Sequence, residues 1–256
     1  MEDYVTLERS DDVMIVRFDR QGALNAFDQK MITELTDTAK LLAEDLTLRS
    51  VVLTGASAAF SSGIDLKDAQ NWALEAMSDL EIRRRFYRGV RLCQAWEDLP
   101  QITIAAAEGM MVGAGCALGL ACDWRVLASD AYLFVPEVQV GLNLQWGALP
   151  RLVTLVGPAR AKEICLLGEK MSSDQALDWG LVSRLAEPGR SVEVALGLAQ
   201  RCAANPPIAS AMVKEAVNAI AGALHKVSSY ADADQSQLSG TNAAAQQARA
   251  NFADKK

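Results

Sequence analysis

Three short stretches of the chain carry the residue types that anion stabilisation and proton transfer require. Two are glycine-containing turns at residues 60–67 and 109–116, and the third is residues 135–141, where Glu137 lies among apolar neighbours. Backbone N–H groups in such turns lack intrahelical partners, and glycine lets a ligand approach them closely. Two N–H groups aimed at one oxygen would stabilise an enolate or a tetrahedral anion. Desolvation would raise the pKa of Glu137 towards neutrality, which suits a group that transfers protons.

Each stretch also has a simpler interpretation. A glycine-rich turn after a strand is usually only a turn, and neither turn matches a P-loop or a dinucleotide-binding fingerprint. A glutamate that follows a proline is usually solvated or begins a helix. The three stretches together, in this order and spacing, are more specific than any one of them alone.

Hydrophobic periodicity and capping residues predict the elements that must position these stretches. The predicted strands are residues 13–18, 50–54, 102–107, 124–127 and 132–135. The predicted helices are residues 28–44, 78–99, 115–121, 145–156, 158–167, 172–179, 191–204, 206–222 and 224–239. Strands alternate with helices early in the chain and helices dominate later. We therefore expect an α/β core followed by a mainly helical C-terminal part.

The composition narrows the possible functions. The chain has 256 residues, 50% of them hydrophobic and 22% charged, which fits one large globular domain. The net charge of -7 disfavours binding to nucleic acid or to anionic lipid. His225 is the only histidine, which disfavours metal sites with several histidines and Ser-His or Cys-His catalysis. Five cysteines without a CxxC pair predict reduced thiols in a cytoplasmic protein.

Residues 102–122 are nearly all apolar, which raises the question of a membrane span. Glu108 interrupts this segment, Pro100 and Asp123 flank it, and no cluster of Lys or Arg marks one end. A buried strand, a glycine-rich turn and a packed helix explain the same residues better. The acidic N-terminus lacks the apolar stretch of a signal peptide, so no membrane association is expected.

Taken together, the motifs resemble those of the crotonase superfamily, the enoyl-CoA hydratase/isomerase family. The resemblance runs from about residue 5 to residue 252, nearly the whole chain. Its markers are ALNAF at 23–27, FSSGIDLK at 60–67, GMMVGAGC at 109–116, ACD at 121–123, Pro136-Glu137 with Gly141, and DQALDWGLV at 174–182. The combination is specific for the superfamily and much less specific for the reaction.

The resemblance implies a ClpP/crotonase-like α/β fold of stacked ββα units. Residues 1–195 would form the core and residues 196–256 a helical trimerisation region, giving a homotrimer or a hexamer. The amides of Ile64 and Ala114 would hold the carbonyl oxygen of an acyl-CoA thioester. That thioester is the substrate, and no further cofactor and no metal are implied. The residues expected to contact CoA or the acyl group are Ala23, Leu24, Ser62, Asp65, Leu66, Lys67, Gly113 and Trp146.

One departure from the family pattern directs the functional prediction. Hydratases of the family pair two glutamates, and here the corresponding positions hold Ala117 and Glu137. Moving a double bond from C3 to C2 needs one carboxylate, so we predict Δ3-Δ2 enoyl-CoA isomerisation with Glu137 as the acid–base group. The alternatives are a hydratase with a substitute acid, for which Asp68 and Glu108 are weak candidates, and an acyl-CoA-binding subunit without catalysis.

Several other residues carry weaker expectations. Trp146 and Trp72 would bound the acyl pocket, or would be core or subunit-contact aromatics. The arginine run at residues 83–91 is expected to be a solvated helix face, with a role near the CoA phosphates as the alternative. The tail at 242–252 lacks the family's acidic and aromatic pattern, so no contribution to the acyl pocket is predicted from it. His225 is expected at the surface or at a subunit interface.

Overall fold

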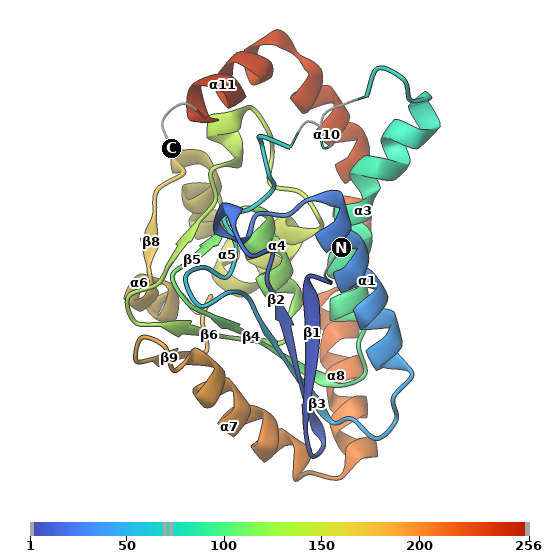
Figure 1. Ribbon diagram of the computed structural model, residues 1–256, viewed down its shortest axis with the longest axis vertical. Coiled ribbons are helices and arrows are strands. Elements are labelled where there is room, and N and C mark those ends of the chain that lie inside the picture. Colours follow the sequence, from blue (N-terminus) through green and yellow to red (C-terminus); the bar gives the residue numbers. More distant parts are fainter. Residues whose placement is uncertain (1–2, 69–70, 72–73, 254–256) are drawn as a thin grey trace.

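A mixed β-sheet lies at the centre of the computed structural model, which describes residues 3–68, 71 and 74–253 (Figure 1). In this part of the chain the sheet has six strands in the order β1-β2-β3-β4-β6-β9. Its strands are β1 (Val5–Ser10), β2 (Val13–Phe18), β3 (Ser50–Thr54), β4 (Ile102–Ala107), β6 (Trp124–Ala128) and β9 (Arg184–Ala186). The β1 and β2 strands pair antiparallel, and the remaining neighbours pair parallel.

A smaller sheet joins β5 (Met110–Val112), β7 (Tyr132–Phe134) and β8 (Met171–Ser172). The chain leaves the large sheet for the small one at Gly109, where φ is +64° and an added Cβ would lie 2.1 Å from the carbonyl oxygen of Ala58. Only glycine tolerates both the positive φ and this approach. The turn thus brings β5 beside the loop after β3, where Ser61 and Met111 form a parallel bridge.

Helices cover both faces of the large sheet. The helices of the described residues are α1 (Gln29–Ala43), α3 (Asp79–Glu97), α4 (Ala114–Ala121), α5 (Ala148–Leu167), α6 (Ser173–Asp178), α7 (Ser191–Ala203), α8 (Pro207–Ala221), α9 (His225–Ser229), α10 (Asp232–Thr241) and α11 (Ala243–Ala253), and not all of them pack on the sheet. Successive residues of β3 point to opposite faces of the sheet and belong alternately to two separate clusters of core residues. Val52 packs with the α7 side, whereas Val51 and Leu53 pack with α1, α3 and α4. Burial on both faces explains the continuous apolar run of this strand.

Local sequence signals fix the ends of the helices that precede the site. The Asp28 side chain accepts a hydrogen bond from the amide of Met31 and caps α1. Ser78 and Glu81 form a reciprocal capping box at the start of α3. Such caps satisfy N–H groups that the first turn of a helix leaves without partners.

The predicted α/β class, strands and helices are confirmed, with local differences. β1, β5, β8 and β9 were not predicted, because β1 is an edge strand whose central residues are exposed and the other three strands have only two or three residues each. The predicted helix at 224–239 is two helices, α9 and α10, whereas the predicted helices at 145–156 and 158–167 form one helix, α5, which is kinked at Gly157. Residues 102–122 form β4, β5 and α4 within the core, and no helix of the described residues is long and apolar enough to span a bilayer.

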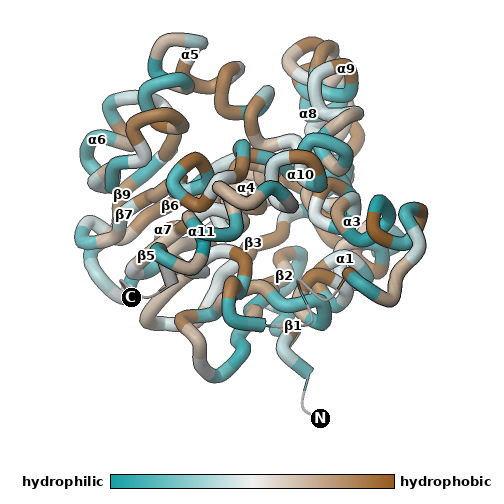
Figure 2. Tube along the Cα trace, turned by 90° about the horizontal axis from the view of Figure 1, so that it is seen from above, coloured by the Kyte–Doolittle hydropathy of each residue, from teal (hydrophilic) through white to brown (hydrophobic). Residues whose placement is uncertain are grey.

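The C-terminal helices extend over the same end of the molecule as the candidate site. α10 contacts α3, and α11 contacts the short 3-10 helix η2 (Glu137–Val140). In Figure 1 these two helices form the top of the molecule, above α4. Helix α8 instead runs along one side, where Figure 2 shows hydrophobic residues along α8 and α9 at the molecular edge.

Candidate active site

The carboxyl group of Glu137 is the centre of the site. Glu137 begins η2, directly after β7 and Pro136. Part of the residue remains accessible, but its Oε2 atom is shielded from solvent and has no hydrogen-bond partner among the described residues. Burial of the carboxyl group raises its pKa to about 7. Near neutral pH the group is therefore present in both protonation states, so it can accept a proton and return it.

Two backbone N–H groups lie close to this carboxyl group. Ala114 is the first residue of α4, so its amide has no intrahelical acceptor. The bridge between Phe27 and Ile64 uses the carbonyl of Gly63 and the amide of Asp65, so the Ile64 amide takes no part in it. An added Cβ on Gly63 would lie 3.6 Å from the Ala114 nitrogen, which shows how closely the two turns approach. The arrangement provides two unpaired donors from adjacent backbone segments.

Two adjoining cavities meet at these groups. We call them the Trp146 cavity, of about 100 Å³, and the Lys67 cavity, of about 280 Å³. The residues that line both are Ile64, Ala114, Glu137 and Leu142. A ligand that occupies both cavities would thus place its middle section against the two amides and the carboxyl group.

The cavities contain the residues that the sequence suggested for ligand contact. From that set, the Lys67 cavity is lined by Ala23, Leu24, Ser62, Asp65, Leu66, Lys67 and Gly113. Trp146 lines the other cavity, together with Gln29, Ile32, Asn71, Arg85, Phe86, Gly89, Ala117, Asn143, Leu144, Gln145 and Ser236. Trp72 lies outside the described residues. The structure therefore brings together, at one site, positions that lie more than a hundred residues apart in the sequence.

The Trp146 ring is held in place by its neighbours. It meets Phe27 edge to face, with 5.7 Å between ring centroids. An added Cβ on Gly89 would lie 1.9 Å from the Cε2 atom of Trp146, so only glycine at this position of α3 leaves room for the indole. Trp146 consequently forms a fixed wall of its cavity.

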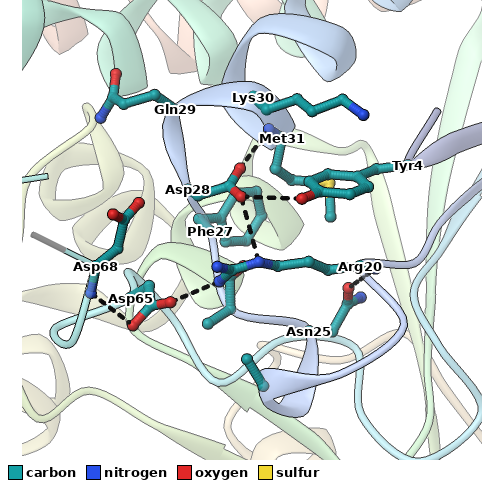
Figure 3. A network of polar contacts seen from close by, with 12 residues as sticks. Tyr4, Arg20, Asn25, Phe27, Asp28, Gln29, Lys30, Met31, Asp65 and Asp68 are labelled. Carbon is teal, nitrogen blue, oxygen red and sulfur yellow. Dashed lines mark hydrogen bonds and ion pairs between the residues drawn. The ribbon is translucent and has the colours of Figure 1, made fainter. Parts of the chain in front are cut away.

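A polar network anchors the loop that carries the Ile64 amide (Figure 3). Arg20 forms ion pairs with Asp28, at 3.2 Å, and with Asp65, at 2.6 Å. Asp65 also accepts hydrogen bonds from the amides of Lys67 and Asp68. Burial opposes ionisation of Asp65, but these hydrogen bonds outweigh it and hold its pKa below the usual value. The Asp65 carboxylate thus shapes the loop, and Arg20 is a positioning residue that the sequence did not single out.

Neither substitute acid considered from the sequence reaches the site. Glu108 accepts hydrogen bonds from the amides of Gly189 and Ser191 at the start of α7, each at 2.9 Å. Asp68 lines neither cavity. The suggestion that Glu108 supplies a second acid is therefore wrong, because its carboxylate caps a helix. No group of three or more His, Cys, Asp or Glu placed to hold a metal ion occurs within residues 3–68, 71 and 74–253.

The packing of α3, α10 and α11 bears on two further expectations, and it corrects the one about the arginine run. Arg85 lines the Trp146 cavity, and Arg88 donates hydrogen bonds to Gln29, so the arginine run is not wholly a solvated face. Ser236 of α10 lines the Trp146 cavity, and Phe252 of α11 lines the Lys67 cavity. Helices α10 and α11 thus both reach the site, but no described residue of the tail at 242–252 lines the Trp146 cavity, where the acyl group is expected.

His225 lies outside both cavities. Its ring nitrogens are 3.2 Å from the Thr154 hydroxyl and 3.5 Å from the Glu97 carboxylate. The five cysteines are free thiols, and burial raises the pKa of Cys93, Cys116 and Cys122. Neither residue type supplies a nucleophile to the site, and Glu137 is the only carboxylate among the described residues that lines both cavities.

A buried acid beside two amides without partners among the described residues could stabilise an anion while it transfers a proton. The model of the family "Enoyl-CoA hydratase/isomerase" matches residues 8–256. The chain belongs to this family, whose crotonase fold it shares, and it is an enzyme of the family.

Individual relatives agree with this assignment. The chain is 31% identical to a short-chain-enoyl-CoA hydratase of Clostridium acetobutylicum over 84% of its own length and 80% of the relative's. It is 32% identical to a mitochondrial enoyl-CoA hydratase of Pongo abelii over 85% of its length and 73% of the relative's. A solved enoyl-CoA hydratase of Mycobacterium avium subsp. paratuberculosis has the same fold, with a TM-score of 0.87, 24% identity, and coverage of 99% and 96%.

Proposed function

We propose that this enzyme adds water across the double bond of a 2-enoyl-CoA thioester, with Glu137 as its single acid–base group. The observation that carries the proposal is the free, buried Oε2 atom of Glu137 at the junction of the two cavities. Hydration rather than isomerisation is supported by the names of the relatives, which are enoyl-CoA hydratases. The proposal replaces isomerisation as the favoured reaction.

The geometry suggests how the substrate would lie. The thioester carbonyl oxygen would accept hydrogen bonds from the amides of Ile64 and Ala114. The acyl group would extend into the Trp146 cavity, and the pantetheine arm into the Lys67 cavity. Lys67 is exposed at this second cavity, where its ammonium group would meet a phosphate of CoA.

One carboxylate is enough to balance the reaction. The ionised Glu137 takes a proton from water while the water oxygen bonds to C3 of the enoyl group. The electron pair of the double bond moves to the thioester oxygen, and the two amides stabilise the resulting enolate. Glu137 then gives its proton to C2, the carbonyl re-forms, and the carboxylate is restored. The product gains one hydroxyl at C3 and one hydrogen at C2.

Isomerisation remains a second candidate because of Ala117. This buried alanine lines the Trp146 cavity at the position where family hydratases hold a second glutamate. Glu137 is the sole carboxylate among the described residues that line this cavity. A single carboxylate can remove a proton from C2 of a 3-enoyl thioester and return it at C4, with the dienolate held by the same two amides.

Matched thioesters distinguish these reactions. Purified protein is incubated with 2-enoyl-CoA and 3-enoyl-CoA of equal chain length, and products are separated and weighed by mass spectrometry. The proposal expects the 2-enoyl thioester to gain the mass of one water. Conversion of the 3-enoyl to the 2-enoyl thioester without water gain would establish isomerisation instead. Saturable binding of both thioesters with no turnover would show a non-catalytic acyl-CoA-binding subunit.

We also propose that copies of the chain assemble through α8 as a homotrimer or as a pair of trimers. Ile208, Met212 and Ile220 of this helix are each more than half exposed, at 76%, 63% and 81%. Contiguous apolar surface of this kind marks an interface in a soluble protein. Light scattering after size-exclusion chromatography should give three or six times the chain mass of 27.5 kDa. A monomer at micromolar concentration would overturn this proposal.

A further inference from the structure

The Trp146 cavity contains a cation that no reaction step above uses. Arg85 of α3 is partly buried and lines this cavity. Its Nε atom is shielded from solvent and has no hydrogen-bond partner among the described residues. Its Nη1 atom donates to the sulfur of Met77 at 3.4 Å, and a thioether is a weak acceptor. The guanidinium group of Arg85 therefore has N–H donors without acceptors, and its planar geometry fixes the directions in which they point.

The neighbouring polar side chains do not supply the missing acceptor. Gln29 donates to Asn71, and Asn71 donates to the carbonyl of Asp65. Gln145 donates to Asn143 and accepts from Ser236. These amides and the hydroxyl are thus engaged with one another or with backbone. Arg85 differs from them because its charge meets no carboxylate within ion-pair distance in the part of the chain that the structure describes.

The surroundings of Arg85 have an excess of positive charge. Arg88, one turn further along α3, donates to the side chain and carbonyl of Gln29 and to Thr33, all neutral acceptors. Burial lowers the pKa of Arg88, and repulsion from Arg85 lowers it further. The guanidinium groups of Arg85, which lines the cavity, and Arg88, which does not, therefore repel each other, and Asp37 offsets only part of this effect on Arg88. An anion bound at Arg85 would relieve the repulsion.

Glu137 is not that anion. Burial raises the pKa of Glu137, and no cation among the described residues counteracts the rise. Glu137 lines both cavities, whereas Arg85 lines only the Trp146 cavity and so lies away from the junction of the two. A ligand whose thioester lies at Glu137 would have the distal end of its acyl group towards Arg85.

We propose that Arg85 binds a carboxylate at the distal end of the acyl group, so that the preferred substrate is a short unsaturated dicarboxylic acid carried as its mono-CoA thioester. This inference rests on the proposed function, since it needs an acyl-CoA thioester in the two cavities. The cavity of about 100 Å³ favours a short chain. A planar carboxylate matches the paired donors of a guanidinium group, and an apolar chain end would leave them unsatisfied.

The test compares two five-carbon 2-enoyl-CoA thioesters, one ending in a carboxylate and one ending in a methyl group. The ratio of their kcat/KM values is measured for the wild type, Arg85→Met, Arg85→Lys and Arg84→Met. Arg84 is an exposed neighbour on the same helix and lines neither cavity, so it is the matched control. Because each ratio is taken on one enzyme preparation, a fraction of misfolded variant does not change it.

The wild type should favour the carboxylate-ended thioester by about 30-fold or more, the loss usual when one member of a buried charged pair is removed. Arg85→Met should abolish this preference, Arg85→Lys should retain part of it, and Arg84→Met should leave it unchanged. Preference of the wild type for the methyl-ended thioester, or an unaltered ratio in Arg85→Met, would overturn the proposal.

Binding separates this proposal from the proposed reaction. Calorimetry is performed with the saturated mono-CoA thioester of a five-carbon dicarboxylic acid and with its methyl-ended analogue. Tighter binding of the carboxylate form, lost in Arg85→Met, would support the role of Arg85 even if neither enoyl thioester were hydrated. Equal binding of the two thioesters to the wild type would refute it whatever the reaction.

Discussion

A Cβ atom added to Gly113 would lie 2.8 Å from the Oε1 atom of Glu137. The carboxyl group of Glu137 thus lies in the space that a side chain at position 113 would need. The second glycine turn supplies the Ala114 amide one residue later. One short segment therefore sets the distance between the Ala114 amide, which would hold the thioester oxygen, and the Glu137 carboxyl group, which would exchange a proton with the α-carbon.

This contact predicts a large effect of Gly113→Ala. The methyl group would push the carboxyl group away, and the φ of +50° would be strained for alanine. We expect kcat/KM to fall about 100-fold, the loss that a misplacement of about 1 Å can cause. Gly197→Ala is the matched control, since Gly197 lies in α7 with nothing within 4 Å. Gly197→Ala should keep its activity and unfold at a slightly higher urea concentration than the wild type. Wild-type activity of Gly113→Ala would show that the space beside the Glu137 carboxyl group does not control the reaction.

The raised pKa of Glu137 predicts opposite pH dependences of activity and stability. Water addition needs the ionised carboxylate, so kcat/KM should rise with pH through about 7. The folded state binds this proton more tightly than the unfolded chain, whose ordinary value is 4.5. The free energy of unfolding should therefore fall as the pH rises from 4.5 to about 7, by up to about 3 kcal/mol in total. Below pH 4.5, ionisation of Glu137 should not affect the free energy of unfolding.

Urea unfolding of the wild type and Glu137→Gln at pH 5 and pH 8 checks the stability part. The glutamine variant carries no charge at either pH, so its advantage over the wild type should grow from pH 5 to pH 8. A constant difference between the two proteins would mean that the Glu137 carboxyl group is not buried in solution.

Restoring a second carboxylate at Ala117 should change the balance between reactions. In Ala117→Glu, the new side chain could activate water while Glu137 protonates C2, so hydration should increase relative to 3-enoyl isomerisation. We expect that ratio to rise about 10-fold or more, given what a general base usually contributes. Ala117→Gln fills the same space without a base and should not raise the ratio. Equal behaviour of the two variants would show that added volume, not the second base, controls the reaction.

The ion pairs of Arg20 should matter for the chemical step. Arg20→Met frees Asp65 and loosens the loop that carries the Ile64 amide. Because that amide acts on the developing oxyanion, kcat should fall about 10-fold with a smaller change in KM. Arg9→Met removes an exposed ion pair with Asp45 and should leave kcat intact. A rise in KM with constant kcat for Arg20→Met would place its role in substrate binding instead.

Sequence reasoning identified the parts of the site that depend on local signals. Ile64, Ala114 and Glu137 follow strands at turns whose glycines and proline are visible in the sequence, and the structure brings them together. Contacts between distant helices had no such signal. The arginine run of α3 did not show which arginine faces inward, because this depends on how α1 and α10 pack against the helix.

The C-terminal tail illustrates the same limit of local patterns. Its Ala- and Gln-rich composition predicts little, yet Ala245 of α11 lies against Gly141, where an added Cβ would be 2.5 Å away. This close approach brings Phe252 to the Lys67 cavity. β1 was likewise missed because its stability derives from pairing with β2, and its own side chains are mostly exposed.

In the proposed reaction, the Glu137 carboxyl group would move protons at the carbon next to a thioester whose oxygen is held by two amides. Deuterium uptake at C2 of a bound 3-hydroxyacyl-CoA in D₂O, followed by mass spectrometry, measures this step directly. The wild type should incorporate deuterium, and Glu137→Gln should do so at least about 100-fold more slowly. Undiminished exchange in Glu137→Gln would contradict the account.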